Sequence, residues 1–202
     1  MRAKNRTGIL GGTFDPVHIG HLEIASGALA TAPLDRVLFM PVGAPAHRET
    51  HAPAADRAEM VRLALEGEDE RLQYDATALD QPGPAYTADT LVLVREAYPD
   101  DALFFIAGAD SLAHSPWRRL DEVAGAVDRF YVVPRRGSSW RDVERVIGEL
   151  GPSLLARFTP LDIPVADVSS SEIRARIAGG QSIDGLVPER VARYIERRGL
   201  YK

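Results

Sequence analysis

Residues 8–21 read GILGGTFDPVHIGH, and they join an expected strand to an expected helix. Residues 8–10 begin a short apolar run, and a helical pattern covers residues 21–32. Two glycines between them let the backbone approach a ligand closely. The turn from a strand into a helix favours phosphate, because backbone N–H groups and the helix dipole meet there. His18 and His21 can donate hydrogen bonds to phosphate oxygens, so this stretch predicts a phosphate site after the first strand.

The alternation of apolar runs and helical patterns continues along the chain. We expect further strands at residues 36–40, 72–75, 103–107 and 130–133, and further helices at residues 54–66, 88–98 and 140–150. The last third adds the apolar stretch 154–158 and helices at residues 170–178 and 188–198. This order predicts an α/β fold, a Rossmann-like doubly wound parallel sheet with helices on both faces. We expect a single domain, residues 1–202, with a C-terminal helical segment.

The composition narrows the possible function classes. Of the 202 residues, 45% are apolar, which is enough for a core without covalent or metal cross-links. The absence of cysteine excludes disulfides, thiolate metal sites and thiol nucleophiles. A net charge of −5 argues against nucleic acid as a partner, because a basic face would be expected. No window approaches the ~20 apolar residues of a membrane helix, so we expect no membrane partner and a cytoplasmic location.

Each part of the opening stretch also has a simpler interpretation. Gly11 and Gly12 could form only a tight turn, Asp15-Pro16 could start the helix, and both histidines could lie on the surface. A zinc site is disfavoured because the H-E-x-x-H pattern and a third ligand are both missing, so no metal-ligating side chains are predicted. The chain has no G-x-x-x-x-G-K-[ST] motif, so we do not expect a P-loop protein. The first loop lacks G-x-G-x-x-G, so we do not expect a dinucleotide-cofactor domain either.

A second phosphate candidate is the stretch VSSSEIR at residues 168–174. Ser169 and Glu172 have the spacing of a capping box, which is how many helices begin. A helix start with spare serine hydroxyls and Arg174 within two turns is also an anion site. Capping and anion binding are compatible, and charge-assisted hydrogen bonds contribute about 1.5–3 kcal/mol each.

The two stretches together resemble a known pair of signatures. GGTFDPVHIGHL near the N-terminus and SSSEIR near the C-terminus resemble the HxGH nucleotidyltransferases. Four further segments resemble the bacterial nicotinate-nucleotide adenylyltransferases: residues 41–48, PAYTADTL at 84–91, FIAGADSL at 105–112, and Trp117. The resemblance spans residues 7–198. It implies transfer of the AMP half of ATP to nicotinate mononucleotide in NAD biosynthesis, with Mg²⁺ carried by ATP.

The resemblance also implies roles for particular residues. His18 and His21 are the expected catalytic residues, which stabilise developing charge. ATP is expected to bind to Gly11, Gly12, Thr13, Phe14, Gly108, Asp110, Ser169, Ser170 and Arg174. Nicotinate mononucleotide is expected to bind to Tyr86, Thr87, Trp117, His47 and Arg48. Residues 160–202 would complete the ATP phosphate site.

Three positions depart from the family pattern. Ser171 stands where threonine is usual, and Arg118 follows Trp117 where tyrosine is frequent. The sequence PRRG at residues 134–137 replaces the common Arg-Pro-Gly, which leaves the role of Arg135 open.

Other interpretations remain open from the sequence. Thr87 or Asp110 could cap a helix, Trp117 could belong to the core, and His47 with Arg48 could lie in a solvated loop. Alternative functions are adenylyl transfer to the amide mononucleotide or to phosphopantetheine, and a nucleotide-binding regulatory domain without catalysis. A homo-oligomer is compatible with the sequence, which does not fix the oligomeric state.

Overall fold

The computed structural model describes residues 5–46, 49–81, 83–114, 117–134, 140–148 and 150–202. In this part of the chain one sheet contains β1 (Arg6–Gly12), β2 (Arg36–Pro41), β3 (Leu72–Tyr74), β4 (Ala102–Gly108), β5 (Arg129–Val133) and β6 (Phe158–Pro160). All neighbouring strands are parallel, and their order is β3-β2-β1-β4-β5-β6. This order confirms the predicted doubly wound parallel sheet.

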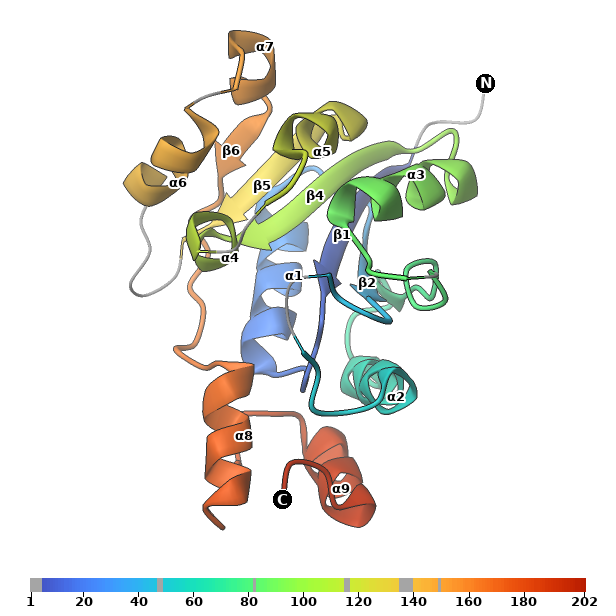
Figure 1. Ribbon diagram of the computed structural model, residues 1–202, viewed down its shortest axis with the longest axis vertical. Helices are drawn as coiled ribbons and strands as arrows, with labels where there is room; N and C mark the ends of the chain where they lie inside the picture. The colour runs from blue at the N-terminus through green and yellow to red at the C-terminus, as the bar shows by residue number, and fades with distance from the viewer. Residues whose placement is uncertain (1–4, 47–48, 82, 115–116, 135–139, 149) are drawn as a thin grey trace.

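Helices connect the strands and extend beyond the sheet (Figure 1). The described helices are α1 (Ile19–Thr31), α2 (Ala54–Leu65), α3 (Thr87–Ala97), α4 (Ala109–His114), α5 (Leu120–Ala126), α6 (Trp140–Ile147), α7 (Pro152–Leu155), α8 (Ser170–Ala178) and α9 (Glu189–Arg198). Figure 1 shows α8 and α9 at one end of the molecule, with the C-terminus between them and α9 near α2. The last part of the chain is thereby brought back to the segments that follow β1 and β2.

Alternate residues of the central strands point into two separate cores. Ile9 and Phe105 belong to the core that packs α3, α4, α5 and α6 on one face of the sheet. Leu10 and Phe104 belong to the core that packs α1, α2, α8 and α9 on the other face. All four side chains are buried. The central strands read as continuous apolar runs because both faces of each strand are covered.

The structure differs from the predicted elements mainly in the shortest segments. The periodic pattern did not predict α4 and α5, because each is too short to repeat an apolar spacing. The apolar stretch at residues 154–158 is divided between the end of α7 and the start of β6. The first helix begins at Ile19, so the alternative in which Asp15-Pro16 starts it is wrong.

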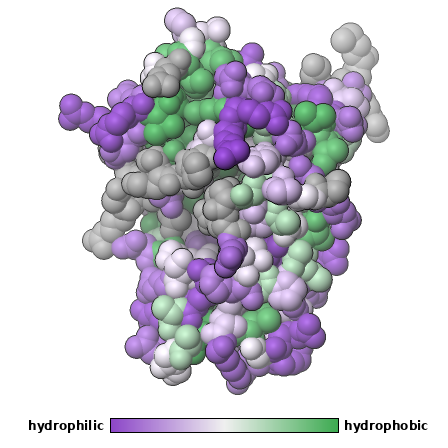
Figure 2. Space-filling model, in the orientation of Figure 1, coloured by the Kyte–Doolittle hydropathy of each residue, from purple (hydrophilic) through white to green (hydrophobic). Residues whose placement is uncertain are grey.

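The winding of the chain changes direction between β1 and β4, which are neighbours at the centre of the sheet. In sheets of this kind a crevice opens at the carboxyl ends of the strands on either side of this point. The face shown in Figure 2 mixes hydrophilic and hydrophobic residues, and Val92 is the one large hydrophobic side chain exposed among the described residues. None of the described helices is long and apolar enough to cross a membrane.

Candidate active site

A cavity of about 990 Å³ opens at the carboxyl ends of β1 and β4. This volume is at the upper end of the range for small-molecule sites. The predicted site residues on its wall are Gly11, Gly12, Thr13, Phe14, His18, His21, Tyr86, Thr87, Gly108, Asp110, Trp117, Ser169, Ser170 and Arg174. The other two predicted residues, His47 and Arg48, lie outside the described residues, as does Arg135. The fold thus gathers segments from both ends of the chain at one cavity.

The start of α1 fixes the two histidines against each other. His18 is the N-cap residue, and its backbone N–H donates to His21 Nδ1 at 3.2 Å. The two rings stack with centroids 3.7 Å apart, and Phe14 meets His21 edge-on at 4.9 Å. Because His21 Nδ1 accepts a hydrogen bond, the proton of a neutral His21 ring lies on Nε2. His18 is 2% exposed, so the alternative of two ordinary surface histidines is wrong.

Two glycines of the opening stretch lie tightly against neighbours within the protein. A Cβ at Gly12 would lie 3.0 Å from the ring of Phe14, which itself has a positive φ of 49°. A Cβ at Gly20 would lie 3.2 Å from both His18 Nδ1 and Val168 Cγ1. The glycine at position 20 therefore lets the segment before α8 pack directly against the first turn of α1.

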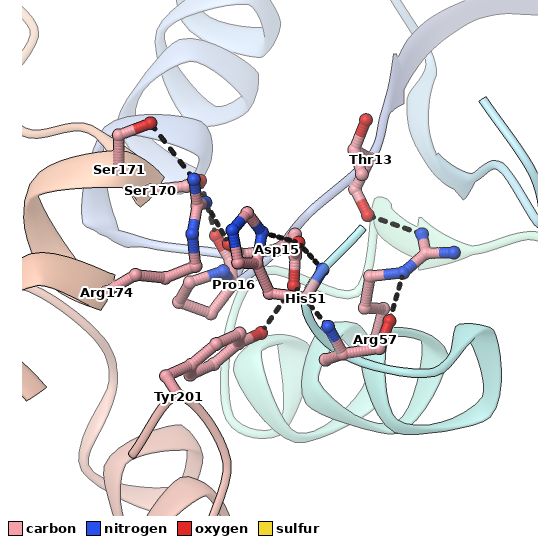
Figure 3. Close-up of polar contacts among 10 residues, drawn as sticks. Thr13, Asp15, Pro16, His51, Arg57, Ser170, Ser171, Arg174 and Tyr201 are labelled. Carbon is pink, nitrogen blue, oxygen red and sulfur yellow. Dashed lines mark hydrogen bonds and ion pairs between the residues drawn. The ribbon is translucent and has the colours of Figure 1, made fainter. Parts of the chain in front are cut away.

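Asp15 is the centre of a polar network that connects four parts of the chain (Figure 3). Its buried carboxylate accepts from the backbone N–H of His51 at 2.7 Å and from the Tyr201 hydroxyl at 2.8 Å. Its backbone carbonyl accepts from Arg174 Nη1 at 2.7 Å. Burial raises the pKa of the Tyr201 hydroxyl, and the hydrogen bond to Asp15 raises it further. Asp15 lies in the opening stretch, but the sequence did not predict that it joins these segments.

Arg57 on α2 is a second residue that the sequence interpretation missed. It is fully buried, and its guanidinium donates to the backbone carbonyls of Thr13 at 2.7 Å, Val42 at 2.7 Å, Gly43 at 2.5 Å and Ala52 at 3.2 Å. Burial lowers its pKa. The sequence does contain a signal for its burial. Arg57 falls at helical spacing on the same face of α2 as Met60, Val61 and Ala64, which are buried.

The start of α8 supplies the second phosphate candidate. Ser169 is the N-cap residue, and its hydroxyl accepts from the Glu172 backbone N–H at 3.1 Å. Ser170 Oγ donates to the carbonyl of Pro16 at 2.9 Å, and Arg174 Nη2 donates to Ser171 Oγ at 3.2 Å. These contacts attach α8 to the opening stretch, so the two phosphate candidates form one continuous wall of the cavity.

The start of α3 and Trp117 also line the cavity. Thr87 is the first residue of α3, and the N-cap is Tyr86 with no side-chain cap, so the alternative of Thr87 as the N-cap is wrong. Trp117 Nε1 donates to the carbonyl of Ser111 at 2.8 Å. Its ring meets Phe105 and Phe130 edge-on at 6.1 and 5.9 Å, so it packs partly on the core while it borders the cavity.

Carboxylates on the cavity wall come from separate segments. Asp110 is the second residue of α4 rather than its cap, and Asp15 and Glu49 come from two other loops. In the described part of the chain, no group of three or more His, Asp or Glu side chains is placed to hold a metal ion. Asp89 does not line the cavity, and Arg119 binds it at 2.5 Å.

The fold and the cavity at its switch point place the chain in a class of nucleotide-binding α/β proteins. The family described as cytidylyltransferase-like matches residues 9–176. The nicotinate-nucleotide adenylyltransferase of Bacillus subtilis is 38% identical over 200 residues, which cover 98% of each chain. A relative from Thermus thermophilus, named a probable nicotinate-nucleotide adenylyltransferase, is 41% identical over 98% of this chain and 100% of its own. The chain belongs to the nicotinate-nucleotide adenylyltransferase family.

A solved structure supports the same fold at greater distance. The nicotinic acid mononucleotide adenylyltransferase of Plasmodium falciparum, complexed with NaAD, aligns with a TM-score of 0.76 at 16% identity. The alignment covers 98% of this chain and 97% of the Plasmodium chain. The fold is therefore shared over almost the whole length of both chains.

Proposed function

We propose that this chain is an enzyme that transfers the adenylyl group of ATP to nicotinate mononucleotide, giving nicotinate adenine dinucleotide and pyrophosphate. One observation carries the proposal: Arg174 of α8 bonds to the Asp15 carbonyl in the opening stretch, so two phosphate candidates meet at one cavity. Thr87 and Trp117 border the same cavity, which gives a second substrate a place beside the phosphates. The names of the relatives support the same reaction.

The reaction requires no nucleophile from the protein. A phosphate oxygen of the mononucleotide attacks the α-phosphorus of ATP and forms the new P–O bond. The bond from the α-phosphorus to the bridging oxygen breaks, and pyrophosphate leaves with the electron pair. Catalysis then depends on holding the two substrates in line and on stabilising the charge that moves onto pyrophosphate. His18 and His21 lie at the start of α1 and line the cavity, and they would donate to these phosphate oxygens.

The remaining ATP contacts divide between the two ends of the cavity wall. Gly11, Gly12, Thr13 and Phe14 would lie against the triphosphate, and Gly108 with Asp110 would lie against the ribose. Ser169, Ser170 and Arg174, which line the cavity, would bind the β- and γ-phosphates, and residues 160–202 would thereby complete the ATP site. Mg²⁺ would arrive with ATP as part of the substrate, because phosphate oxygens and water are ligands that it prefers.

The mononucleotide would bind beside Tyr86, Thr87 and Trp117. Trp117 would stack on the pyridine ring, and the first N–H groups of α3 would bind the carboxylate. His47 and Arg48 would contact its phosphate. A site lined with donors leaves the NH₂ of an amide unpaired, which costs about 1–3 kcal/mol. We therefore expect nicotinate mononucleotide to be preferred over the amide by at least roughly tenfold in kcat/KM.

A pyrophosphate-release assay tests the proposal. The purified chain with MgATP should release pyrophosphate when nicotinate mononucleotide is added, and the dinucleotide should appear in equal amount. Nicotinamide mononucleotide and phosphopantetheine are the comparison substrates. Faster turnover of either comparison substrate would overturn the assignment of substrate, and absence of turnover with all three would overturn the assignment of catalysis.

A further inference from the structure

Arg118 is a cation on the cavity wall that the proposed reaction does not use. It lines the cavity together with Tyr86, Thr87 and Trp117. Its guanidinium carbon lies 5.7 Å from the centre of the Tyr86 ring, within the range of a cation–π interaction. Tyr86 is the N-cap residue of α3, so this contact holds the guanidinium next to the start of that helix.

The neighbouring arginine shows how different the surroundings of Arg118 are. Arg119 binds Asp89 at 2.5 Å and Glu122 at 2.6 Å, and it does not line the cavity. Among the described residues, no carboxylate forms an ion pair with Arg118. Asp89 and Glu122 are bound by Arg119, and the charge of Arg118 is available to a ligand.

We propose that Arg118 is a specificity-determining residue that favours a pyridine carboxylate over a pyridine carboxamide. This inference rests on the proposed function, because it concerns which mononucleotide that reaction accepts. The two groups have nearly the same shape, and they differ in charge. A guanidinium presents N–H donors and a positive charge to both oxygens of a carboxylate, whereas the NH₂ of an amide offers it no acceptor.

The two mononucleotides carry the same 5′-phosphate, which makes the comparison clean. Any attraction of Arg118 for that phosphate, and any general effect of charge on ATP, cancels in the ratio of the two kcat/KM values. Arg118 is exposed to solvent, so salt should screen its attraction for the carboxylate. We therefore expect the acid-to-amide ratio of the unmodified chain to fall as ionic strength rises.

The decisive variant is Arg118→Gln, assayed with MgATP and each mononucleotide. The ratio of kcat/KM for acid over amide should fall by about tenfold, which is the size expected for one charge-assisted hydrogen bond. The loss should appear as a higher KM for the acid, with the amide and ATP values nearly unchanged. Arg118→Lys keeps the charge but loses the planar guanidinium, so it should keep only part of the ratio.

The matched control is Arg119→Gln, which removes the same charge one residue away from a side chain outside the cavity. It should leave the ratio unchanged. An unchanged ratio in Arg118→Gln, an equal loss for both substrates, or an equal change in Arg119→Gln would overturn the inference while leaving adenylyl transfer intact. An unmodified chain that turns over neither mononucleotide would overturn the proposed function itself.

Discussion

His18 and His21 are held by contacts within the protein. The N–H to Nδ1 bond and the stacked rings fix His21, and Phe14 supports its edge. Replacing His21 with alanine should lower kcat by roughly 10²–10³, the scale for loss of one donor to developing charge. His18→Ala should lower kcat on the same scale and also lower Tm, because His18 is buried. Calorimetry beside the pyrophosphate assay separates the two effects, and near-normal turnover of His21→Ala would contradict its assignment.

Arg174 is the second residue with a testable role in binding. It is tied to Asp15 and Ser171, and it borders the cavity. Arg174→Ala should raise the Kd for ATP far more than the Kd for the mononucleotide, because the assigned ligands are the β- and γ-phosphates. Arg176→Ala is the matched control, since Arg176 lies on the same helix, pairs with Glu172 and does not line the cavity. Equal weakening of both substrates by Arg174→Ala would reduce α8 to a structural support.

The sequence predicted the residues on the cavity wall better than the contacts that hold them. His18, His21, Ser169 and Arg174 lie in short motifs whose residue types suit phosphate, so local pattern was sufficient to select them. Asp15 and Tyr201 stand 186 positions apart. No local pattern indicates that the last turn of the chain returns to the first loop, and only the packed structure shows it.

Arg57 joins the ends of β1 and β2 to the start of α2. Replacing it with methionine leaves four buried or part-buried carbonyls without their donor, which should destabilise the protein by about 3 kcal/mol or more. Tm should then fall by roughly 6–12 °C for a domain of this size. The KM for ATP should rise too, since Thr13 and Val42 line the cavity.

Arg62→Met is the control for that experiment. Arg62 lies on the same helix, is exposed, and stacks over Tyr74 outside the cavity. It should change Tm by only a little and leave KM unchanged. If Arg57→Met behaved in the same way, the four carbonyl contacts would not matter to the site.

The elements that the sequence did not predict are the short ones. A run of buried strands such as residues 103–107 is recognisable because tertiary packing on both faces selects apolar residues throughout. Helices of one or two turns, such as α4 and α5, have no repeated apolar spacing, and their position is set by the strands they connect. Pattern reasoning therefore captured the sheet and the long helices, and it left the short connections undefined.

Two buried carboxylates, Asp15 and Asp56, bind the C-terminal segment to the N-terminal half. Asp56 on α2 accepts from Tyr194 at 2.7 Å and from Arg198 at 3.0 Å. The hydrogen bond from Tyr194, with those from Arg198, lowers the pKa of Asp56 below its ordinary value of 3.8. Its contribution to stability is therefore present above that pH and is lost as pH falls through the lower folded value.

The direction of this pH dependence of stability can be tested with Asp56→Asn. The variant should have a lower Tm than the unmodified chain at pH 7, and the difference should shrink as pH falls below 3.8, because the unfolded chain then takes up a proton that folded Asp56 resists. Calorimetry of both proteins across this range measures the difference directly. A difference that stayed constant down to pH 3 would mean that the ionised form of Asp56 is not what anchors α9.

Tyr201 is the point where the end of the chain meets the site. Its hydroxyl donates to Asp15, whose carboxylate also holds the backbone of His51 and Ala52, and His51 lines the cavity. Tyr201→Phe removes one hydrogen bond to a charged group, which is worth about 1.5–3 kcal/mol. We expect a lower Tm and a KM for ATP that rises by roughly 3–10-fold, because part of that free energy orders the cavity wall.

Tyr194→Phe is the matched control: it removes a similar bond to Asp56, which does not border the cavity, so Tm should fall while KM stays the same. Steady-state kinetics on both variants, with Tm measured in parallel, decide the matter. The same change in KM for both tyrosines, or for neither, would show that the C-terminal segment supports the fold without ordering the site.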